Sequence, residues 1–368
     1  MYKVSYDTRE WNSDNFHFHL DVTSQKDHVT GKIRGWFVDK NQADLELRLC
    51  DNEGKRNDKI VLSIHRPKLP SMYPSIKNVS LSGFEIDLND FDKCQKLSIS
   101  IVDIKNNICI AIPVIFSIFI PLLYIHIPKT AGSTVNKFLL ERFASTRSLI
   151  HVESKDSWKD RLVSGDVDFI SGHLTYKNFM RNSLLNCFNK AITFRDPYQH
   201  ITSHLSWIRS LSLDENNSRY LAHPEYIQKL SDKLVSCDFT DAKNISSVIS
   251  GFEQPEHQLL DNTQTRYIRT DVSKMNVDAL DVKDSLDNLK SFDFVGIDSN
   301  IELFLSDIAV SYGFKPSING IRENVLSTKF GIDPSRDDIR EALEPLIRFD
   351  LQLYREIQSD IDFFRAKT

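Results

Sequence analysis

The sequence predicts an α/β protein in which a small antiparallel β-sandwich precedes a parallel sheet with flanking helices. Two observations lead to this prediction. Before residue 119 apolar side chains recur at every second position between polar turns, whereas after it continuous apolar runs alternate with helical patterns. We therefore expect a sandwich domain over residues 1–119 and an α/β domain over residues 120–368.

Short alternating runs separated by polar turns fill the first part of the chain. They cover residues 29–37, 45–49, 60–64, 84–88, 97–101 and 108–118. A period of two is that of a strand with one buried face, and this spacing of turns is typical of a sandwich. Trp36 and Tyr73 could stack on a sugar ring, although aromatic side chains more often belong to a core.

The second part of the chain contains buried strands separated by helical patterns. The apolar runs at 122–127, 169–170, 191–194 and 292–297 are typical of parallel strands covered on both faces. Helical periodicity appears at residues 135–143, 226–235 and 242–264. It returns at residues 337–364, where Pro345 is expected to restart the helix.

Composition and charge exclude several classes of protein. Of the 368 residues, 26% are charged and 40% are hydrophobic, as in globular domains rather than disordered chains. The formal net charge of -5 lacks the basic excess of nucleic-acid-binding proteins, so no nucleic acid partner is expected. The five cysteines are dispersed without a CxxC pair, which indicates free thiols in a reducing compartment.

We expect neither a secretion signal nor a membrane segment. The first residues lack a basic stretch followed by an apolar core. Residues 108–127 are apolar over about the thickness of a membrane, but Pro113 and Pro121 divide them into strand-length pieces. The expected location is therefore the cytoplasm, and the oligomeric state stays open.

An anion-binding loop is predicted at the segment Tyr124-Ile-His-Ile-Pro-Lys-Thr-Ala-Gly-Ser-Thr-Val135. A buried strand leads into a tight turn at a helix N-terminus, where unpaired N–H groups and the helix dipole favour an anion. Gly132 permits close approach of the backbone, Ser133 and Thr134 offer hydroxyl groups, and Lys129 supplies positive charge. The structural alternative is a plain helix start capped by Ser133 or Thr134. This is not a Walker A loop, because Lys129 precedes Gly132 and no earlier glycine is present.

This loop resembles the 5′-phosphosulfate loop of sulfotransferases that use 3′-phosphoadenosine 5′-phosphosulfate (PAPS). It is most similar to the carbohydrate branch, which includes the heparan sulfate 2-O-sulfotransferases and has a loop much like the IPKTAGST found here. The resemblance spans roughly residues 121–357 and implies a P-loop-like parallel sheet. It also implies PAPS as donor and 3′-phosphoadenosine 5′-phosphate (PAP) as product. The residues implied at the 5′ end are Lys129, Thr130, Ala131, Gly132, Ser133 and Thr134.

A second strand-to-helix turn, Arg195-Asp-Pro, follows the apolar run at 191–194. Arginine can make a bidentate contact with a phosphate, and Ser203 comes about two helical turns later. The family binds the 3′-phosphate of PAPS with such a turn and a serine at this interval, which implies Arg195 and Ser203 for that role. His200 stands where the family usually has a second arginine, and whether it replaces that arginine stays open. Taken alone, Arg195 would more readily pair with Asp196 or another carboxylate.

A general base is expected to deprotonate the acceptor hydroxyl, and histidine is the usual base near neutral pH. His173 follows Gly172 at the end of an apolar run, and the carboxyl ends of parallel strands line ligand crevices. This turn resembles the Gly-His turn of the carbohydrate branch, which implies His173 as the base. Lys129 would stabilise charge on the oxygen that leaves sulfur. The alternatives for the base are His151, His200, His204 and His257, and His126 is expected in the core or behind the site.

Other segments resemble the family less specifically. Residues 261–268 are similar to a segment near the acceptor cleft, which implies Gln264 and Arg266 as substrate contacts, although these residues could equally cap a helix. Residues 322–325 lie where some members complete the nucleotide pocket. No metal is expected, because transfer from PAPS does not require one and the sequence shows no ligand cluster. The sandwich looks similar to accessory domains of bacterial carbohydrate-modifying enzymes.

The resemblance implies a bacterial-type PAPS-dependent sulfotransferase whose acceptor is a hydroxyl of a polysaccharide, oligosaccharide or glycolipid. Two alternatives stay open. A nucleotide-dependent, kinase-like phosphotransferase would show magnesium-dependent ATP turnover, whereas a non-catalytic glycan-binding protein would bind PAP without transfer. A protein tyrosine is a further acceptor within the enzyme hypothesis.

Overall fold

The computed structural model describes residues 2–6, 10–21, 28–29, 32–41, 44–51, 57–87, 96–154, 157–164, 166–213, 217–315 and 330–365. Contacts between residues divide the chain into two compact units. The first comprises Met1–Pro121 with the short segments Arg161–Asp166 and Ser311–Gly313, and the second comprises the rest. The main division falls beside the boundary predicted between residues 119 and 120.

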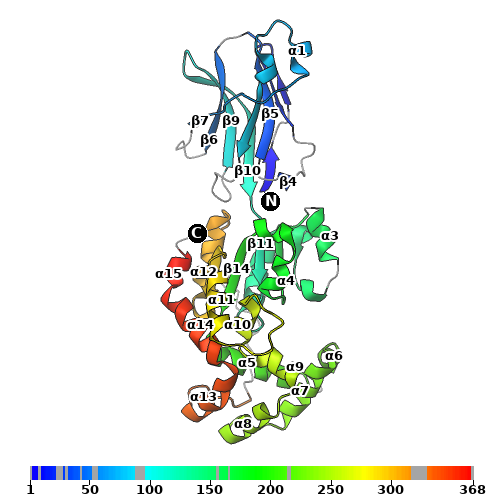
Figure 1. Ribbon diagram of the computed structural model, residues 1–368, viewed down its shortest axis with the longest axis vertical. Helices are drawn as coiled ribbons and strands as arrows, with labels where there is room; N and C mark the ends of the chain where they lie inside the picture. Colours follow the sequence, from blue (N-terminus) through cyan, green and yellow to red (C-terminus); the bar gives the residue numbers. More distant parts are fainter. Residues whose placement is uncertain are drawn as a thin grey trace. The chain divides into compact units, whose positions relative to one another are not determined.

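Two antiparallel sheets make up the first unit (Figure 1). One has the strand order β4-β1-β10-β9-β6-β7, and the other has the order β2-β3-β5-β8. The strands are β1 Tyr2–Tyr6, β2 Glu10–Asn12, β3 Phe16–Leu20, β4 His28–Val29, β5 Lys32–Asp39, β6 Leu45–Asp51, β7 Asn57–Lys59, β8 Gly83–Asp87, β9 Lys96–Asp103 and β10 Ile108–Phe119. Two short helices, α1 Leu69–Met72 and η1 Val79–Leu81, precede β8.

Both sheets contribute to one apolar core. Phe18 of β3 and Phe84 of β8 come from the smaller sheet, and Leu97 and Ile99 of β9 come from the larger one. All four side chains are fully buried. The predicted antiparallel sheets are confirmed, and a core shared between two facing sheets is what a sandwich requires.

The strand expected at residues 60–64 is wrong. Residues 60–63 are not in a strand, and Ile64 makes only an isolated antiparallel bridge to Gly83. A Cβ at Gly83 would lie 2.6 Å from the main-chain oxygen of Ile64. The absence of a side chain at Gly83 therefore lets the two backbones meet at one point without a continuous ladder.

The aromatic residues considered for sugar stacking belong to a local cluster in the first unit. Trp36 and Tyr73 pack against Val38 and Leu69. The hydroxyl of Tyr73 is hydrogen-bonded to Nδ1 of His17, whose ring centroid lies 4.6 Å from that of Trp36. These contacts give both residues a packing role, and glycan binding by them stays a prediction.

Five parallel strands form the sheet of the second unit, in the order β12-β13-β11-β14-β15. They are β11 Leu122–Ile125, β12 Ser148–Leu149, β13 Phe169–Gly172, β14 Asn189–Phe194 and β15 Phe294–Ile297. Every residue of β11, β13, β14 and β15 is buried, as expected for a sheet covered on both faces. The prediction of a parallel sheet is confirmed, and the apolar stretch at 108–127 forms β10 and β11.

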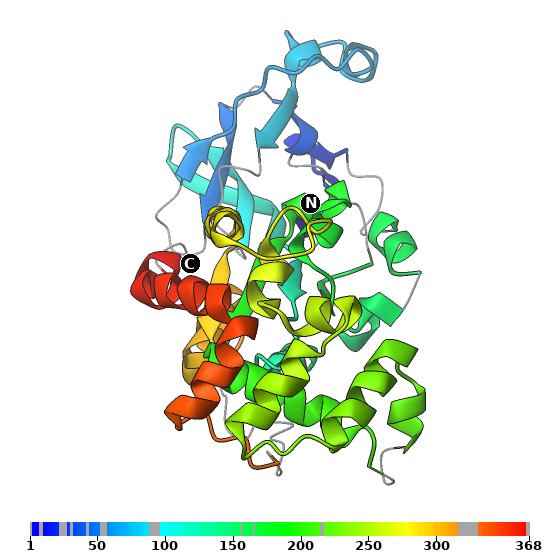
Figure 2. The same cartoon turned by 60° about the horizontal axis from the view of Figure 1, so that its bottom comes forward.

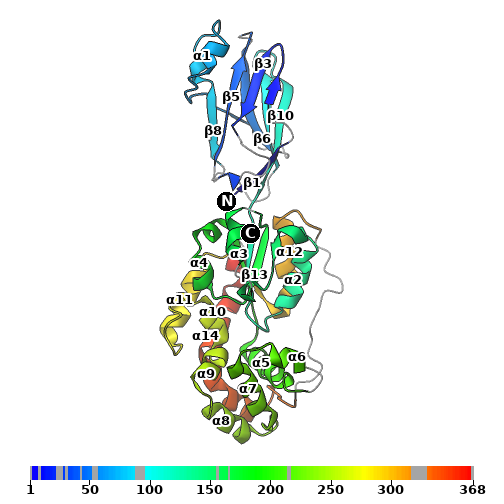
Figure 3. The ribbon, with the colours of Figure 1, turned by 90° about the vertical axis from the view of Figure 1, so that its right-hand side faces the viewer.

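Helices surround this sheet. They are α2 Gly132–Leu140, α3 Trp158–Val163, α4 Tyr176–Met180, α5 Pro197–Ser210, α6 Asn217–Leu221, α7 Glu225–Val235, α8 Ala242–Ser250, α9 Gln254–Leu260, α10 Thr263–Ile268, α11 Ala279–Leu289, α12 Ile301–Ser311, α13 Asp337–Leu343, α14 Arg348–Ser359 and α15 Ile361–Arg365. In Figure 3, α2 and α12 lie on one side of the sheet, and α4, α10 and α11 lie on the other. Figure 2 brings forward the green and yellow-green helices α5 to α9, and α5, α7, α8 and α13 share an apolar core.

The predicted helices are confirmed for α2 and α7, and the tail breaks at Pro345 as expected. The single helix expected over residues 242–264 is wrong, because Gly251 ends α8 and Asn262 adopts a left-handed backbone (φ 46°) before α10. Among the helices that the structure describes, none has the length and apolar character to cross a bilayer.

Candidate functional site

The strand order reverses direction at the carboxyl ends of β11 and β14. These two strands are parallel neighbours, with Leu122 opposite Asn189 and Ile125 opposite Ile192. The chain leaves β11 toward β12 on one side of the sheet and leaves β14 toward β15 on the other. In open parallel sheets, ligands bind where neighbouring connections diverge in this way. The predicted loop at 128–134 and the turn at 195–197 therefore start from the same edge.

The loop after β11 has an alternating backbone. Lys129 and Ala131 have positive φ angles of 68° and 64°, whereas Thr130 between them does not. Alternation of hand along successive residues forms concave sites of N–H groups that favour anions. A left-handed non-glycine residue costs roughly 1–2 kcal/mol, so the surroundings must hold this conformation in place.

Buried hydroxyl groups supply that support. Thr130 donates from Oγ1 to the carbonyl of Ile127 at 2.9 Å, and Thr193 of β14 donates from Oγ1 to the carbonyl of Thr130 at 2.8 Å. The hydroxyl of Tyr124 lies 2.6 Å from Oγ1 of Thr193. All three side chains are fully buried. These bonds fasten the loop after β11 to the neighbouring strand.

Helix α2 begins at Gly132 without a side-chain cap. Its N-cap residue is Ala131, so the alternative in which Ser133 or Thr134 caps this helix is wrong. A Cβ at residue 132 would lie 1.9 Å from ring atoms of His126, so only glycine permits this packing. The ring of His126 is buried, and its Nδ1 has no hydrogen-bond partner among the described residues. His126 is thus a packing residue behind the loop, as expected.

Lys129 carries a positive charge without a compensating carboxylate among the residues that the structure describes. Its ammonium group lies 5.8 Å from the ring centroid of Trp207. Burial is the main reason that the pKa of Lys129 falls to about 8, and repulsion by Arg195 and Arg219 lowers it further. An ammonium group held among other cations attracts an anion.

Arg195 links the turn after β14 to the loop after β11. Its Nη1 donates to the main-chain oxygen of Lys129 at 3.1 Å. Its Nε lies 3.0 Å from Oδ2 of Asp298 but makes no hydrogen bond, so this is an ion pair without good alignment. The alternative in which Arg195 pairs with a carboxylate therefore holds in part, through Asp298 rather than Asp196. Asp196 instead caps helix α5 by accepting the N–H of Gln199 at 2.9 Å.

One face of helix α5 looks onto the loop. His200, Ser203 and Trp207 are three and four residues apart and so lie along the same face. Nε2 of His200 donates to the carbonyl of Pro128 at 2.8 Å, and Trp207 contacts Lys129. Ser203 lies between these two residues along the helix and is half-buried.

The structure gives His200 a supporting role. Its side chain is buried, and its hydrogen bond to the loop carbonyl fixes Nε2 as the donor. Burial lowers the pKa of His200 to about 4, and the charges of Arg195 and Lys129 contribute in the same direction. His200 is therefore neutral near pH 7 and does not supply the charge of an arginine. His204, another residue considered for the base, is also buried, and burial lowers its pKa.

Gln264 and Arg266 are engaged by the protein itself. The side-chain amide of Gln264 accepts the N–H of Arg195 at 2.8 Å and donates to its carbonyl at 2.9 Å. Arg266 forms an ion pair with Asp261 and donates to the carbonyl of Met275 at 2.8 Å. Gln264 thus positions Arg195, and contact of either residue with an acceptor stays a prediction.

His173 presents one ring nitrogen away from the backbone. Its Nδ1 lies 2.8 Å from the carbonyl of His126, which can only accept, so Nδ1 carries the proton and Nε2 is left with a lone pair. Its main-chain N–H donates to Oε2 of Glu153 at 2.8 Å. Burial lowers the pKa of His173, while Glu153 and the bond to His126 act in the opposite direction. The charge of Lys129 also lowers the pKa of His173, so the loop and His173 belong to one electrostatic environment.

Two further ligand-type residues lie near His173 in the fold. His151 and Glu153 lie in the segment before α3, and Nδ1 of His151 is 3.4 Å from Oε1 of Glu153. Ligand atoms of His151, Glu153 and His173 all lie within 4.8 Å of one another. The His151 backbone is left-handed, with φ 53°. An isolated histidine in a short irregular segment carries no periodic signal, so sequence alone could not place it here.

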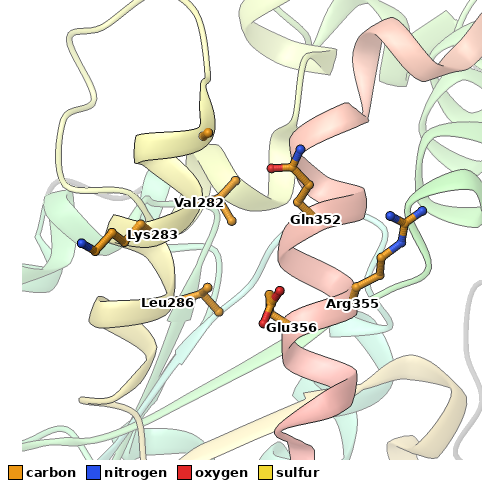
Figure 4. Close-up of a pocket in the computed structure, with 7 residues that line it drawn as sticks. Val282, Lys283, Leu286, Gln352, Arg355 and Glu356 are labelled. Carbon is orange, nitrogen blue, oxygen red and sulfur yellow. The ribbon is translucent and has the colours of Figure 1, made fainter.

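The structure also contains a groove between α11 and α14, shown in Figure 4. Its lining includes Val282 and Leu286 from one helix and Arg355 and Glu356 from the other. None of the residues predicted for the site lines it. His257, the remaining candidate for the base, is exposed on α9. Residues 322–325, considered for the nucleotide pocket, lie outside the described residues.

Comparisons with known proteins add no assignment. The chain matches no protein-family model, and no curated protein is detectably similar to it in sequence.

Proposed function

We propose that this protein is a sulfotransferase that moves a sulfuryl group from PAPS to a hydroxyl group of a carbohydrate acceptor. The observation that supports this most strongly is the meeting of two turns at one edge of the parallel sheet. Arg195 contacts the main chain of Lys129, although the two residues are 66 positions apart. A bisphosphorylated nucleotide needs two cationic sites, and Lys129 and Arg195 would supply them.

The 5′ end of the donor would lie in the loop after β11. The alternating backbone, the uncapped start of α2 and the ammonium group of Lys129 all favour a doubly charged anion there. Thr130, Ala131, Gly132, Ser133 and Thr134 complete this loop. The 3′-phosphate would bind Arg195 and the hydroxyl of Ser203.

The reaction requires one bond to form and one to break at sulfur. The acceptor oxygen attacks the sulfur atom, while the bond between sulfur and the bridging 5′-phosphate oxygen breaks. The hydroxyl proton passes to Nε2 of His173, whose lone pair is available because Nδ1 donates to His126. The bond electrons remain on the leaving oxygen, so the products are the sulfate ester and PAP.

Lys129 would act on the leaving oxygen. A fixed cation beside developing negative charge is usually a large catalytic contribution. Its pKa of about 8 in the absence of an anion keeps much of the amine protonated near neutral pH. Phosphoryl transfer is the physical analogue, in which positioning and charge neutralisation dominate.

Calorimetry with PAP tests the nucleotide site. We expect Lys129→Ala and Arg195→Ala each to weaken PAP binding by about tenfold to a hundredfold, because each removes a charge-assisted contact. Lys243→Ala, at an exposed position on α8, is the matched control and should leave the affinity unchanged. Unchanged affinity in both site variants would refute the assignment.

Transfer of labelled sulfate tests the reaction. Purified protein, PAPS labelled in sulfur, and a panel of polysaccharides, oligosaccharides and glycolipids are incubated together, with a tyrosine peptide as a separate acceptor. We expect His173→Ala to bind PAP with near-normal affinity and to lose transfer. An active His173→Ala variant would remove His173 from the mechanism. Magnesium-dependent ATP hydrolysis, or PAP binding without transfer to any acceptor, would favour the kinase-like or the glycan-binding alternative.

A further inference from the structure

We propose that His151, Glu153 and His173 form a binding site for a divalent transition metal such as Zn²⁺. This inference goes beyond the proposed function, and metal binding itself does not depend on PAPS. It revises the expectation that the chain contains no ligand cluster. Two imidazoles and one carboxylate are a ligand set that Zn²⁺ takes at sites that keep open positions.

The separations of the ligand atoms suit a small metal ion. Zn–N and Zn–O bonds of about 2.0–2.1 Å place the ligands of a tetrahedral site about 3.4 Å apart. Nδ1 of His151 already lies 3.4 Å from Oε1 of Glu153. Since ligand atoms of all three residues lie within 4.8 Å of one another, adjustments of at most about 1.4 Å bring every pair to the tetrahedral separation. The side chain of His151 is 51% exposed, which leaves room for this adjustment and for a metal ion to enter.

Outer contacts already orient two of the ligands. Ligating histidines usually donate their other ring N–H to a carbonyl or carboxylate, which fixes the tautomer. Nδ1 of His173 makes such a bond to the carbonyl of His126, so Nε2 is the ligand atom. Oε2 of Glu153 accepts the N–H of His173, which leaves Oε1 toward His151.

The end of β13 packs tightly against the segment that carries His151 and Glu153. A Cβ at Gly172 would lie 2.6 Å from Cγ2 of Val152 and 2.7 Å from Oε2 of Glu153. Gly172 therefore lets the end of β13 approach the segment that carries His151 and Glu153. His151 also has a left-handed backbone, which is energetically unfavourable for a residue other than glycine. Backbone strain of this kind clusters at binding sites.

The metal would compete with the proposed reaction. Zn²⁺ bound to Nε2 of His173 occupies the lone pair that would accept the acceptor proton. This consequence rests on the proposed function: Zn²⁺ should inhibit transfer reversibly, with recovery after a chelator. Metal binding and inhibition of transfer can be measured separately, because metal binding is measured without nucleotide.

Spectroscopy with Co²⁺ as the probe tests the site. Tag-free full-length protein is titrated with Co²⁺, the visible absorption is followed, and Zn²⁺ is then added to displace it. We expect His151→Ala and Glu153→Gln each to raise the dissociation constants for both metals by about tenfold or more. His257→Ala, which removes an exposed histidine on α9, is the matched control and should change neither constant.

Circular dichroism and thermal unfolding show whether each variant folds. Glu153→Gln keeps an oxygen that can accept the N–H of His173, so it alone suffices where His151→Ala unfolds. Equal constants in wild type and Glu153→Gln, or no visible absorption band at all, would overturn the metal site. If transfer is absent under every condition but Co²⁺ binding is lost in the site variants, the proposed function fails and the metal site stands.

Discussion

The guanidinium of Arg195 donates to the main-chain oxygen of Lys129, which joins the turn after β14 to the loop after β11. The main-chain N–H and carbonyl of Arg195 are both hydrogen-bonded to the side-chain amide of Gln264. The Arg195 side chain thus contacts the loop, while Gln264 positions the Arg195 backbone. This relationship makes charge and geometry at Arg195 separately testable.

Substitution of Arg195 by lysine should separate these two contributions. Lysine keeps the positive charge but lacks the planar fork that binds phosphate bidentately. We expect Arg195→Lys to bind PAP more weakly than wild type and more tightly than Arg195→Ala in calorimetry. Wild-type affinity in Arg195→Lys would mean that charge alone matters at this position.

Lys129 predicts a proton linkage. Its pKa is about 8 in the unliganded protein, and a bound phosphate favours the charged amine and raises that pKa. PAP binding should therefore take up protons at pH 8.5 through Lys129, whereas at pH 6.5 this amine is already protonated and should contribute almost nothing to the proton exchange. Calorimetry in two buffers of different ionisation enthalpy measures this uptake. Lys129→Ala should show none at pH 8.5, and an uptake that survives the substitution would assign it to another group.

Gln264 should act through Arg195. Gln264→Ala removes two partly buried hydrogen bonds to the Arg195 backbone, which we expect to cost about 1–3 kcal/mol of unfolding free energy in urea. PAP affinity should fall as well, because the Arg195 backbone loses the hydrogen bonds that position it. Gln258→Ala, at an exposed position on α9, is the control for both measurements. Reduced stability with unchanged PAP affinity would contradict the positioning role.

Gly132 and His126 should be coupled energetically. Gly132→Ala places a methyl group against the buried His126 ring, and such overpacking costs typically about 1–3 kcal/mol. In a His126→Ala background the same change should cost far less, because the clashing ring is gone. A double-mutant cycle by urea unfolding measures the coupling. Additive effects would show that the close approach at Gly132 is relieved elsewhere.

Much of the fold could be predicted because buried parallel strands are nearly continuous apolar runs. β11 and β14 were found in this way, whereas β12, at two residues, is too short to give a pattern. β3 is absent from the predicted strands although apolar residues alternate with histidines over Phe16–Leu20, and both histidine rings pack near Trp36 in the folded protein. Gly251 and the left-handed Asn262 divided a stretch whose periodicity alone resembled one helix.

The site was predictable where it depends on strand ends. The loop at Lys129 and the turn at Arg195 follow neighbouring strands, so their meeting follows from the topology. The hydrogen bonds that use Gln264 and His200 as supports arise from tertiary packing, which residue spacing does not encode. The contact of Glu153 with the amide of His173 is of the same kind.

The 66 positions between Arg195 and Lys129 also bear on how the chain unfolds. Under the proposed function, the two turns would form a nucleotide site only once the centre of the sheet has assembled. A bound bisphosphate would then act as a removable cross-link between distant parts of the chain. Ligand that binds only the native state raises the midpoint of thermal denaturation in proportion to the logarithm of its concentration. Increasing concentrations of PAP should thus raise the temperature at which the parallel sheet unfolds.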